Sequence, residues 1–159
     1  MTTGLAEVKK VPGCPLCETA GGVLVWAGAR FRLIRAEEAG FPAFYRVVWS
    51  DHVAEFSDLS SSDRALCMEA VALVERVLRS ELRPEKINLA ALGNMVAHLH
   101  WHVIARFEDD SHFPGSVWAA PLRERDTAHE TALARRLPAV DAALAARFAA
   151  TFAQAALPF

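Results

Sequence analysis

The sequence predicts one domain that combines β-strands with α-helices. Histidines and apolar residues alternate through residues 98–103, which is the periodicity of a strand. Two further apolar runs, residues 23–26 and 31–35, are separated by a short glycine-containing link, as in a hairpin. A long segment that ends near Leu82 instead carries apolar residues at helical spacing. With 159 residues, the chain is long enough to bury a core of its own.

The composition is that of a globular protein without an extended basic surface. Hydrophobic residues make up 53% and charged residues 23% of the chain, and the formal net charge is -2. This balance argues against a nucleic-acid polymer as partner, whereas a small nucleotide needs only a local site. No apolar run approaches the roughly 20 residues of a membrane span, and residues 1–12 lack the apolar core of a signal peptide. The sequence therefore predicts a cytoplasmic protein without a membrane partner.

The first part of the chain is predicted to contain a flexible arm, three strands and a loop. The arm is residues 1–12, and the strands are residues 23–26, 31–35 and 45–49. The loop, residues 37–42, is marked by glycine and proline. Within it, Glu37 and Glu38 are either acceptors for ribose hydroxyls or solvated loop charges.

Two helical regions are predicted. Residues 58–63 are rich in Ser and Asp, which cap helix N-termini, and the main amphipathic helix continues to about Leu82 before Pro84. From Asp126 the chain is rich in Ala, Leu and Arg, and Pro138 divides it into two helices or one broken helix. Its apolar stripe consists of Leu133, Leu137, Val140, Leu144, Phe148 and Phe152. This stripe packs either on the domain or on a partner chain.

A Cys-x-x-Cys pair lies near the N-terminus. Two thiols at the spacing of Cys14 and Cys17 are the usual half of a zinc site, because a tight turn brings both sulfurs to one ion. A redox pair is the alternative, although no thioredoxin-like strand–helix–strand pattern follows. A zinc site needs two more ligands, and His52 and His98 are the candidates. Three cysteines in the chain do not make a disulfide framework.

The histidine row is the strongest functional feature. His98, His100 and His102 are expected to line one face of a strand, roughly 7 Å apart, because successive side chains of a strand point to opposite faces. Three interpretations are open. One imidazole acts as a nucleophile while its neighbours orient it and handle protons. Alternatively, all three bind a catalytic Zn²⁺. In the third interpretation, the histidines simply lie on a partly solvated strand face.

A second strand and a turn precede the histidine row. Residues 87–92 are predicted to form the strand, and Gly93 and Asn94 turn the chain toward the histidines. The turn is either a cradle in which backbone N–H groups approach a phosphate, or only a connection between strands. Residues 107–118, after the histidine strand, are predicted to be irregular.

The histidine segment, residues 98–104, resembles the signature of the histidine triad (HIT) family, in which three histidines alternate with apolar residues. Asn88 and Gly93 before the triad and Arg106 after it fit the family pattern, as does the upstream Cys-x-x-Cys pair. The resemblance spans roughly residues 14–118. Within the family, the chain looks like a bacterial branch that is loosely described as diadenosine polyphosphate hydrolase-like.

The resemblance implies an α+β, HIT-like fold with a mostly antiparallel, roughly five-stranded sheet and a main amphipathic helix. It also implies a homodimer. Residues 13–120 would form the HIT domain, and residues 121–159 a C-terminal helical extension. Members of the family hydrolyse or transfer nucleotides at the α-phosphate, without an organic cofactor.

The resemblance also implies roles for individual residues. His100 matches the nucleophile, which attacks phosphorus and forms a covalent nucleotidyl-histidine that water resolves. His102 would donate to phosphate oxygens and orient the nucleophile. Phosphate and ribose would be bound by Asn88, Gly93, Asn94 and His102. His98 would serve the leaving group or hold a structural zinc ion in a closed, four-ligand site. The ligands of that zinc site would be Cys14, Cys17, His52 and His98.

The sequence also departs from the family pattern. Asn94 and Met95 stand where Gln and a Ser or Thr commonly precede the triad, so the hydroxyl that assists the leaving group is absent. Phe44 replaces a histidine, and Ala105 replaces a proline. The candidates for stacking on a nucleobase are Phe31, Phe41 and Phe44.

Three functions remain as hypotheses. The first is a nucleotide hydrolase or nucleotidyl transferase with His100 as nucleophile. The second is a regulator that binds nucleotides with little or no turnover. The third is a zinc hydrolase in which the three histidines of the row are the metal ligands.

Overall fold

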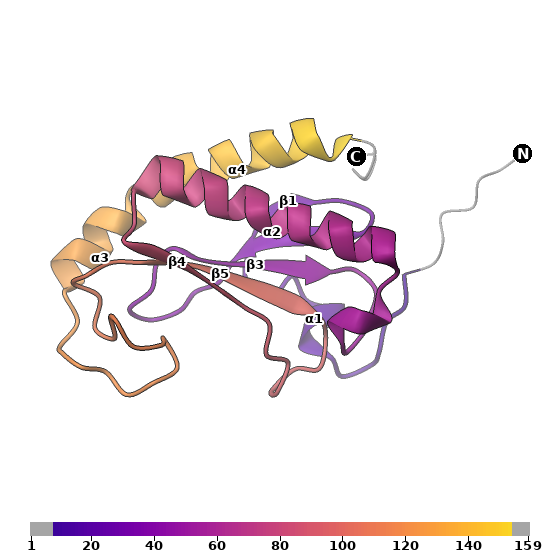
Figure 1. The fold of residues 1–159 in the computed structure, drawn as a ribbon, viewed down its shortest axis with the longest axis horizontal. Helices are drawn as coiled ribbons and strands as arrows, with labels where there is room; N and C mark the ends of the chain where they lie inside the picture. The colour runs from indigo at the N-terminus through magenta and orange to yellow at the C-terminus, as the bar shows by residue number, and fades with distance from the viewer. Residues whose placement is uncertain (1–7, 154–159) are drawn as a thin grey trace, which may run out of the picture.

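The computed structural model describes residues 8–153 and contains a five-stranded sheet with its two long helices on one face (Figure 1). The strand order is β1-β2-β3-β5-β4, and every neighbouring pair is antiparallel. The strands are β1 (Val23–Ala27), β2 (Phe31–Arg35), β3 (Phe44–Trp49), β4 (Lys86–Ala90) and β5 (His100–Arg106). The expected α+β fold with an antiparallel, five-stranded sheet is confirmed.

Helices α2 (Ser61–Leu82) and α4 (Leu137–Thr151) pack against each other over the same face of the sheet (Figure 1). Ser60 caps α2, because its Oγ accepts a hydrogen bond from the Asp63 backbone N–H at 3.1 Å. The helix ends at Leu82, and the C-cap residue Arg83 adopts a left-handed conformation. None of the helices between residues 8 and 153 is both long and apolar enough to cross a membrane.

The C-terminal region forms two helices, α3 (Thr127–Ala134) and α4. Pro138 lies in the first turn of α4, where a proline is compatible with a helix, so it begins this helix rather than breaking one. The apolar stripe packs on the domain itself. Leu144 and Phe148 are fully buried in the same core as Phe31 of β2. The two helices therefore complete the hydrophobic core between the sheet and α2.

The chain around the histidine row departs from regular strand pairing. β4 ends earlier than predicted, at Ala90, and β5 begins later, at His100. Leu99 explains the second difference: its N–H donates to the Val53 carbonyl at 2.8 Å, and its carbonyl accepts from the Trp49 N–H at 3.1 Å. This residue is therefore paired with β3 and the segment that follows it. The connection between β4 and β5 forms a loop on the side of the sheet opposite α2 (Figure 1).

The predicted N-terminal arm is described only in part, since residues 1–7 lie outside the described residues. Lys9 is bonded to the segment after β3. Its backbone N–H donates to Asp51 Oδ1 at 2.8 Å, and its carbonyl accepts from the His52 backbone N–H at 2.8 Å. This contact brings the beginning of the described chain next to one of the predicted metal ligands.

Candidate functional site

Two thiols and two imidazoles converge from three distant parts of the chain. The cysteines flank the start of the short helix α1 (Pro15–Glu18), one histidine follows β3, and the other precedes β5. Nδ1 of His98 lies 3.5 Å from the Sγ of Cys14 and 3.4 Å from the Sγ of Cys17. Nδ1 of His52 lies 3.4 Å from the Sγ of Cys17. All four predicted metal ligands are thus brought together, with their ligand atoms within 4.8 Å of one another.

Backbone contacts hold the cysteine turn in place. Arg32, on β2, donates to the carbonyl oxygens of Leu16 at 2.7 Å and of Thr19 at 3.1 Å. Gly13 precedes the turn with a φ of +82°, a conformation that residues with side chains rarely adopt. Its N–H donates to Glu18 Oε1 at 2.6 Å. These contacts fix the geometry of the turn that presents both sulfurs.

The arrangement fits a tetrahedral metal ion. Zn–S and Zn–N bonds of about 2.3 and 2.0 Å place sulfur and nitrogen ligands about 3.5 Å apart in a tetrahedron, close to the three sulfur–nitrogen distances of 3.4, 3.4 and 3.5 Å. The His98 Nε2–H donates to the Trp49 carbonyl at 2.7 Å, which leaves the Nδ1 lone pair facing the sulfurs. Burial lowers the pKa of His98 and so favours the neutral ring that a metal requires. Cys14, Cys17, His52 and His98 therefore form a candidate metal-binding group.

His100 is held in a single tautomer. Its Nδ1 lies 2.6 Å from the backbone carbonyl oxygen of His98, which can only accept, so Nδ1 carries the proton. Burial lowers the pKa of His100, so the ring is neutral near pH 7 and Nε2 keeps a free lone pair. His98 thus connects two parts of the site: its ring belongs to the metal-binding group, and its carbonyl orients His100.

His102 is held in the opposite tautomer by Arg46, its partner across β3 and β5. The Arg46 Nε–H donates to Nδ1 of His102 at 3.3 Å, so the proton of the neutral ring is on Nε2. Glu38 fixes Arg46 through an ion pair of 2.7 Å. The rings of His100 and His102 lie 4.8 Å apart and nearly perpendicular, at 84°. The lone pair on Nε2 of His100 is therefore available beside the N–H on Nε2 of His102.

The pKa of His102 predicts that the protein loses stability in acid. Burial, followed by repulsion from His100 and Arg46, lowers this pKa from 6.5 to about 3. Between these values the unfolded state binds more protons than the folded state. The free energy of unfolding therefore falls as the pH falls from about 6.5 toward 3. His100 on the same strand and Arg46 on β3 are the charged or titratable groups that face this ring, and both oppose its protonation.

Urea unfolding of wild type and His102→Gln between pH 7 and pH 4 measures this effect. Glutamine does not titrate, so the difference between the two proteins isolates His102 from the carboxylates that they share. We expect wild type to lose at least about 1.4 kcal/mol more than the variant, the equivalent of one pKa unit. The same loss of stability in both proteins would contradict the prediction.

A cavity of about 550 Å³ lies next to His100 and His102, on the sheet face opposite α2. It is lined by Pro15, Leu16, Gly21, Arg46, Leu92, Gly93, Asn94, Met95, Val96, His100, His102 and Trp118. Gly93 has a φ of +73°, which explains the glycine in this turn. The structure therefore brings two of the predicted substrate-binding residues, Gly93 and Asn94, to the same cavity as the two histidines.

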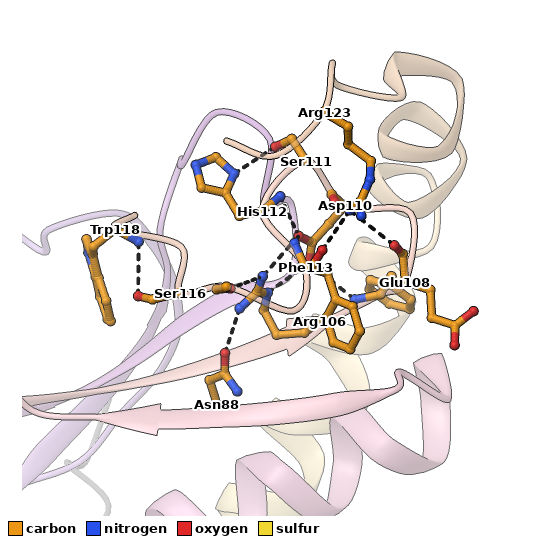
Figure 2. Close-up of polar contacts among 12 residues, drawn as sticks. Asn88, Arg106, Glu108, Asp110, Ser111, His112, Phe113, Ser116, Trp118 and Arg123 are labelled. Carbon is orange, nitrogen blue, oxygen red and sulfur yellow. Dashed lines mark hydrogen bonds and ion pairs between the residues drawn. The ribbon is translucent and has the colours of Figure 1, made fainter. Parts of the chain in front are cut away.

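Asn88, which was also predicted to bind substrate, does not line this cavity. Its Oδ1 accepts a hydrogen bond from Nη1 of Arg106 at 2.7 Å (Figure 2). Arg106 is buried and is paired with Asp110 at 2.8 Å. Asn88 therefore belongs to a buried polar network that also includes the loop after β5.

Sequence reasoning missed Arg46 and Trp118. A charged residue within an otherwise apolar strand was the available signal for Arg46, but its pairing with His102 depends on the register of β3 and β5. Trp118 lies in the irregular segment after β5, and its ring centroid is 5.2 Å from that of His102. No local pattern predicts this approach, because it depends on the path of the loop.

The phenylalanines predicted to stack on a base do not line the cavity. Phe31 is fully buried in the core on the α2 side of the sheet. Phe41 and Phe44 are buried on the opposite side, where the ring of Phe44 packs edge-on against His102. Among the residues that the structure describes, the cavity's aromatic residue other than histidine is Trp118.

The three histidines of the triad do not converge on a common point. The ring of His98 is turned toward the thiols, and its Nε2 is occupied by the Trp49 carbonyl. His100 and His102 instead line the cavity. Within residues 8–153, the one group whose metal ligands converge is the pair of cysteines with His52 and His98. This geometry argues against a zinc hydrolase with three histidine ligands, and it leaves no free ring nitrogen of His98 for a leaving group.

The sequence and the fold resemble those of known proteins. The model of the HIT domain matches residues 22–109. A histidine triad protein from Bradyrhizobium japonicum is 26% identical, with a TM-score of 0.64, over 84% of this chain and 98% of its own. A histidine triad protein from Sinorhizobium meliloti is 30% identical, with a TM-score of 0.59, over 75% of this chain and 90% of its own. No curated protein matches the chain.

A zinc-bound histidine triad family protein from Mycobacterium smegmatis has the same fold, with a TM-score of 0.54 and 19% identity over 82% of this chain and 97% of its own. The family model covers more than half of the 159 residues, and the Sinorhizobium protein reaches 30% identity over three quarters of them. These matches agree with the alternating histidines and with the five-stranded sheet on which they lie. The chain belongs to the HIT domain family.

Proposed function

We propose that the protein is a nucleotide hydrolase or nucleotidyl transferase. It acts at the α-phosphate of a nucleoside polyphosphate or a related nucleotide conjugate. The observation that carries this proposal is the state of His100, a neutral ring whose Nδ1–H is bonded to the His98 carbonyl beside a cavity of about 550 Å³. Its unprotonated Nε2 is a nucleophile in a space large enough for a small ligand. Membership of the HIT family supports a nucleotide as that ligand.

The reaction proceeds in two displacements at phosphorus. Nε2 of His100 forms a bond to the α-phosphorus while the bond from phosphorus to the leaving oxygen breaks, and the leaving group departs with that electron pair. A water oxygen then bonds to phosphorus, the P–N bond breaks, and water loses a proton to solvent. The products are a nucleoside monophosphate, the leaving group and free His100.

The neighbouring residues supply position and charge, which phosphoryl-type transfers need more than covalent assistance. His102 donates from Nε2 to a phosphate oxygen, and Arg46 places a positive charge beside it. The amides near Gly93 and Asn94 bind the phosphate, while Asn88 supports the site through Arg106. Met95 brings no hydroxyl to protonate a leaving group. Polyphosphates, which leave as stable anions, are therefore better substrates than phosphoramidates.

We also propose that the metal-binding group holds a structural zinc ion. Two thiols and two imidazoles are a donor set that zinc prefers, and four protein ligands leave no position for substrate. The zinc-bound relative from Mycobacterium smegmatis, which has the same fold, supports this choice. When bound, zinc supplies a cross-link between α1, the end of β3 and the start of β5. His98 is then a metal ligand rather than a proton donor to the leaving group.

The domain bounds, the oligomeric state and the localisation of the protein are also proposed. Residues 13–120 are the proposed HIT domain and residues 121–159 the proposed extension, whose helices α3 and α4 share the core of the domain. A homodimer is supported by β4, a strand at the edge of the sheet with an exposed Leu89. Cytoplasmic localisation is proposed because Cys14, Cys17 and Cys67 are not joined in disulfides.

The alternative is a nucleotide-binding regulator with little turnover, which the absence of a hydroxyl at Met95 favours. Incubation of the purified protein with an adenosine polyphosphate and with an adenosine phosphoramidate separates the two functions. We expect AMP to be released from both, and faster from the polyphosphate. AMP binding without product from either substrate would favour the regulator. Neither binding nor product would contradict both functions.

A further inference from the structure

Trp118 is a large aromatic side chain that is half-exposed at the edge of the cavity. Its relative exposure is 51%, and its indole lines the cavity that contains His100 and His102. The indole centroid lies 5.2 Å from the ring of His102 and 6.4 Å from the ring of Phe44. Its inner edge is therefore packed, while the rest of the ring is available to a ligand.

The loop that carries Trp118 is fixed by buried polar contacts (Figure 2). Arg106, only 1% exposed, donates to both carboxylate oxygens of Asp110 at 2.8 and 3.0 Å and to the Gly115 carbonyl at 2.9 Å. Asp110 also accepts from the backbone N–H groups of His112 and Phe113 at 3.0 and 2.7 Å. A buried charge is costly unless it is paired in this way, so these contacts specify one path for the loop.

A second arginine, Arg123, donates hydrogen bonds to the backbone of the same loop. Nη1 of Arg123 donates to the carbonyls of Asp110 at 2.6 Å and Phe113 at 2.9 Å. The backbone N–H of Trp118 donates to Oγ of Ser116 at 3.2 Å (Figure 2). The indole is thus presented by a preorganised loop, and a ligand that packs against it does not have to order the loop first.

We propose that Trp118 is the residue that recognises the nucleobase, by stacking on it, while Arg106 and Asp110 position the loop that presents it. This assignment rests on the proposed nucleotide function and specifies which part of the substrate the indole contacts. The ring centroids of Trp118 and His102 lie 5.2 Å apart, and those of His102 and His100 lie 4.8 Å apart. His102 therefore lies between the indole and the nucleophile, as the sugar of a nucleotide lies between its base and its α-phosphate. A flat aromatic base is therefore placed at Trp118 when its α-phosphate is at His100.

Stacking on an aromatic residue tolerates any base, because every base has a π-face. The structure therefore indicates a site that selects nucleotides over sugar phosphates without strong selection among the bases. Gly93 and Asn94, which also line the cavity, supply backbone groups, which suit phosphate better than a base edge.

The test compares AMP with ribose 5-phosphate, which lacks only the base, as ligands of the full chain. Dissociation constants are measured by calorimetry for wild type, Trp118→Phe and Trp118→Leu. Leu122→Ala is the control, because Leu122 is a 63% exposed apolar residue of the same loop that does not line this cavity. Trp118 is half-exposed, so its variants are expected to fold, and their melting temperatures check this.

We expect Trp118→Leu to weaken AMP binding roughly 10- to 100-fold, the range of base–aromatic stacking. The phenylalanine variant should stay within about threefold of wild type, because it keeps an aromatic face. Ribose 5-phosphate should bind wild type and Trp118→Leu equally, and the control should behave as wild type.

Equal AMP affinity in wild type and Trp118→Leu would overturn the assignment, as would equal losses for AMP and ribose 5-phosphate. A phenylalanine variant as weak as the leucine variant would also overturn it. The proposed nucleotide function survives each of these results, because wild type still binds AMP. Failure of wild type to bind AMP would overturn both.

Discussion

Replacement of His100 by asparagine is expected to reduce nucleotide turnover by at least about 10³-fold, as loss of a covalent nucleophile does in other enzymes. The asparagine side chain keeps an N–H that can be donated to the His98 carbonyl, but it has no basic nitrogen to attack phosphorus. Steady-state release of AMP from an adenosine polyphosphate measures the effect. The variant should melt within a few degrees of wild type, because His100 lies at the edge of a cavity rather than in the core.

His112→Asn is the matched control for this substitution. Nδ1 of His112 is 2.8 Å from Oγ of Ser111 in the loop after β5, and the residue does not line the cavity. This variant should retain wild-type turnover. Substantial turnover in His100→Asn would contradict the assignment of the nucleophile. Equal nucleotide affinity in wild type and His100→Asn, with negligible hydrolysis in both, would instead favour the regulator.

Replacement of Cys14 by serine is expected to lower the free energy of unfolding by at least about 3 kcal/mol, because metal binding to a folded site adds its free energy to that of folding. Cys14 is buried beside Nδ1 of His98, and its loss leaves only three ligands for the ion. Metal analysis of the purified, unchelated protein and thermal unfolding with and without a chelator measure the effect. Wild type should contain one zinc ion and be destabilised by the chelator.

Cys67→Ser is the matched control for metal content. Cys67 is even more buried than Cys14, but it lies on α2 within the main core, in a different hydrophobic cluster from Cys14. Its replacement should affect packing while zinc content stays at one ion per chain. The account of this site is contradicted if wild type contains no metal and Cys14→Ser is as stable as wild type.

His98 explains why the metal-binding group and the nucleophile are expected to depend on each other. Its ring contacts both thiols, while its backbone carbonyl accepts the Nδ1–H of His100 at 2.6 Å. An ion that fixes the ring also fixes the carbonyl two bonds beyond the Cα. The alternating sequence places the candidate metal ligand His98 and the proposed nucleophile His100 two residues apart. One short segment of the chain therefore contributes to both parts of the site.

The sequence was sufficient to predict the sheet, the main helix and the four side chains that converge as a candidate metal-binding group. Strand periodicity and helical periodicity are local, and the four candidate ligands can be recognised by residue type even though they lie far apart in the chain. The start of β5 could not be predicted, because the pairing of Leu99 with Trp49 and Val53 is a tertiary contact. The pattern of alternation alone extends the strand through His98.

The sequence was insufficient for the parts of the site that depend on register or loop path. Arg46 becomes a partner of His102 only through the pairing of β3 with β5. The side chain of Asn88 is hydrogen-bonded to Arg106. The buried charge of Arg106 is paired with Asp110, four residues later in the chain. Trp118 reaches the cavity because this ion pair fixes the loop between them. Each of these contacts joins residues that no local pattern links.

The most direct test of the covalent mechanism is mass spectrometry of the intact protein after a rapid quench from reaction with an adenosine polyphosphate. A histidine nucleophile predicts a mass increase of one adenylyl group, located on His100 by fragmentation and absent from His100→Asn. Release of AMP without any adduct, or an adduct on another residue, would contradict the central role of His100.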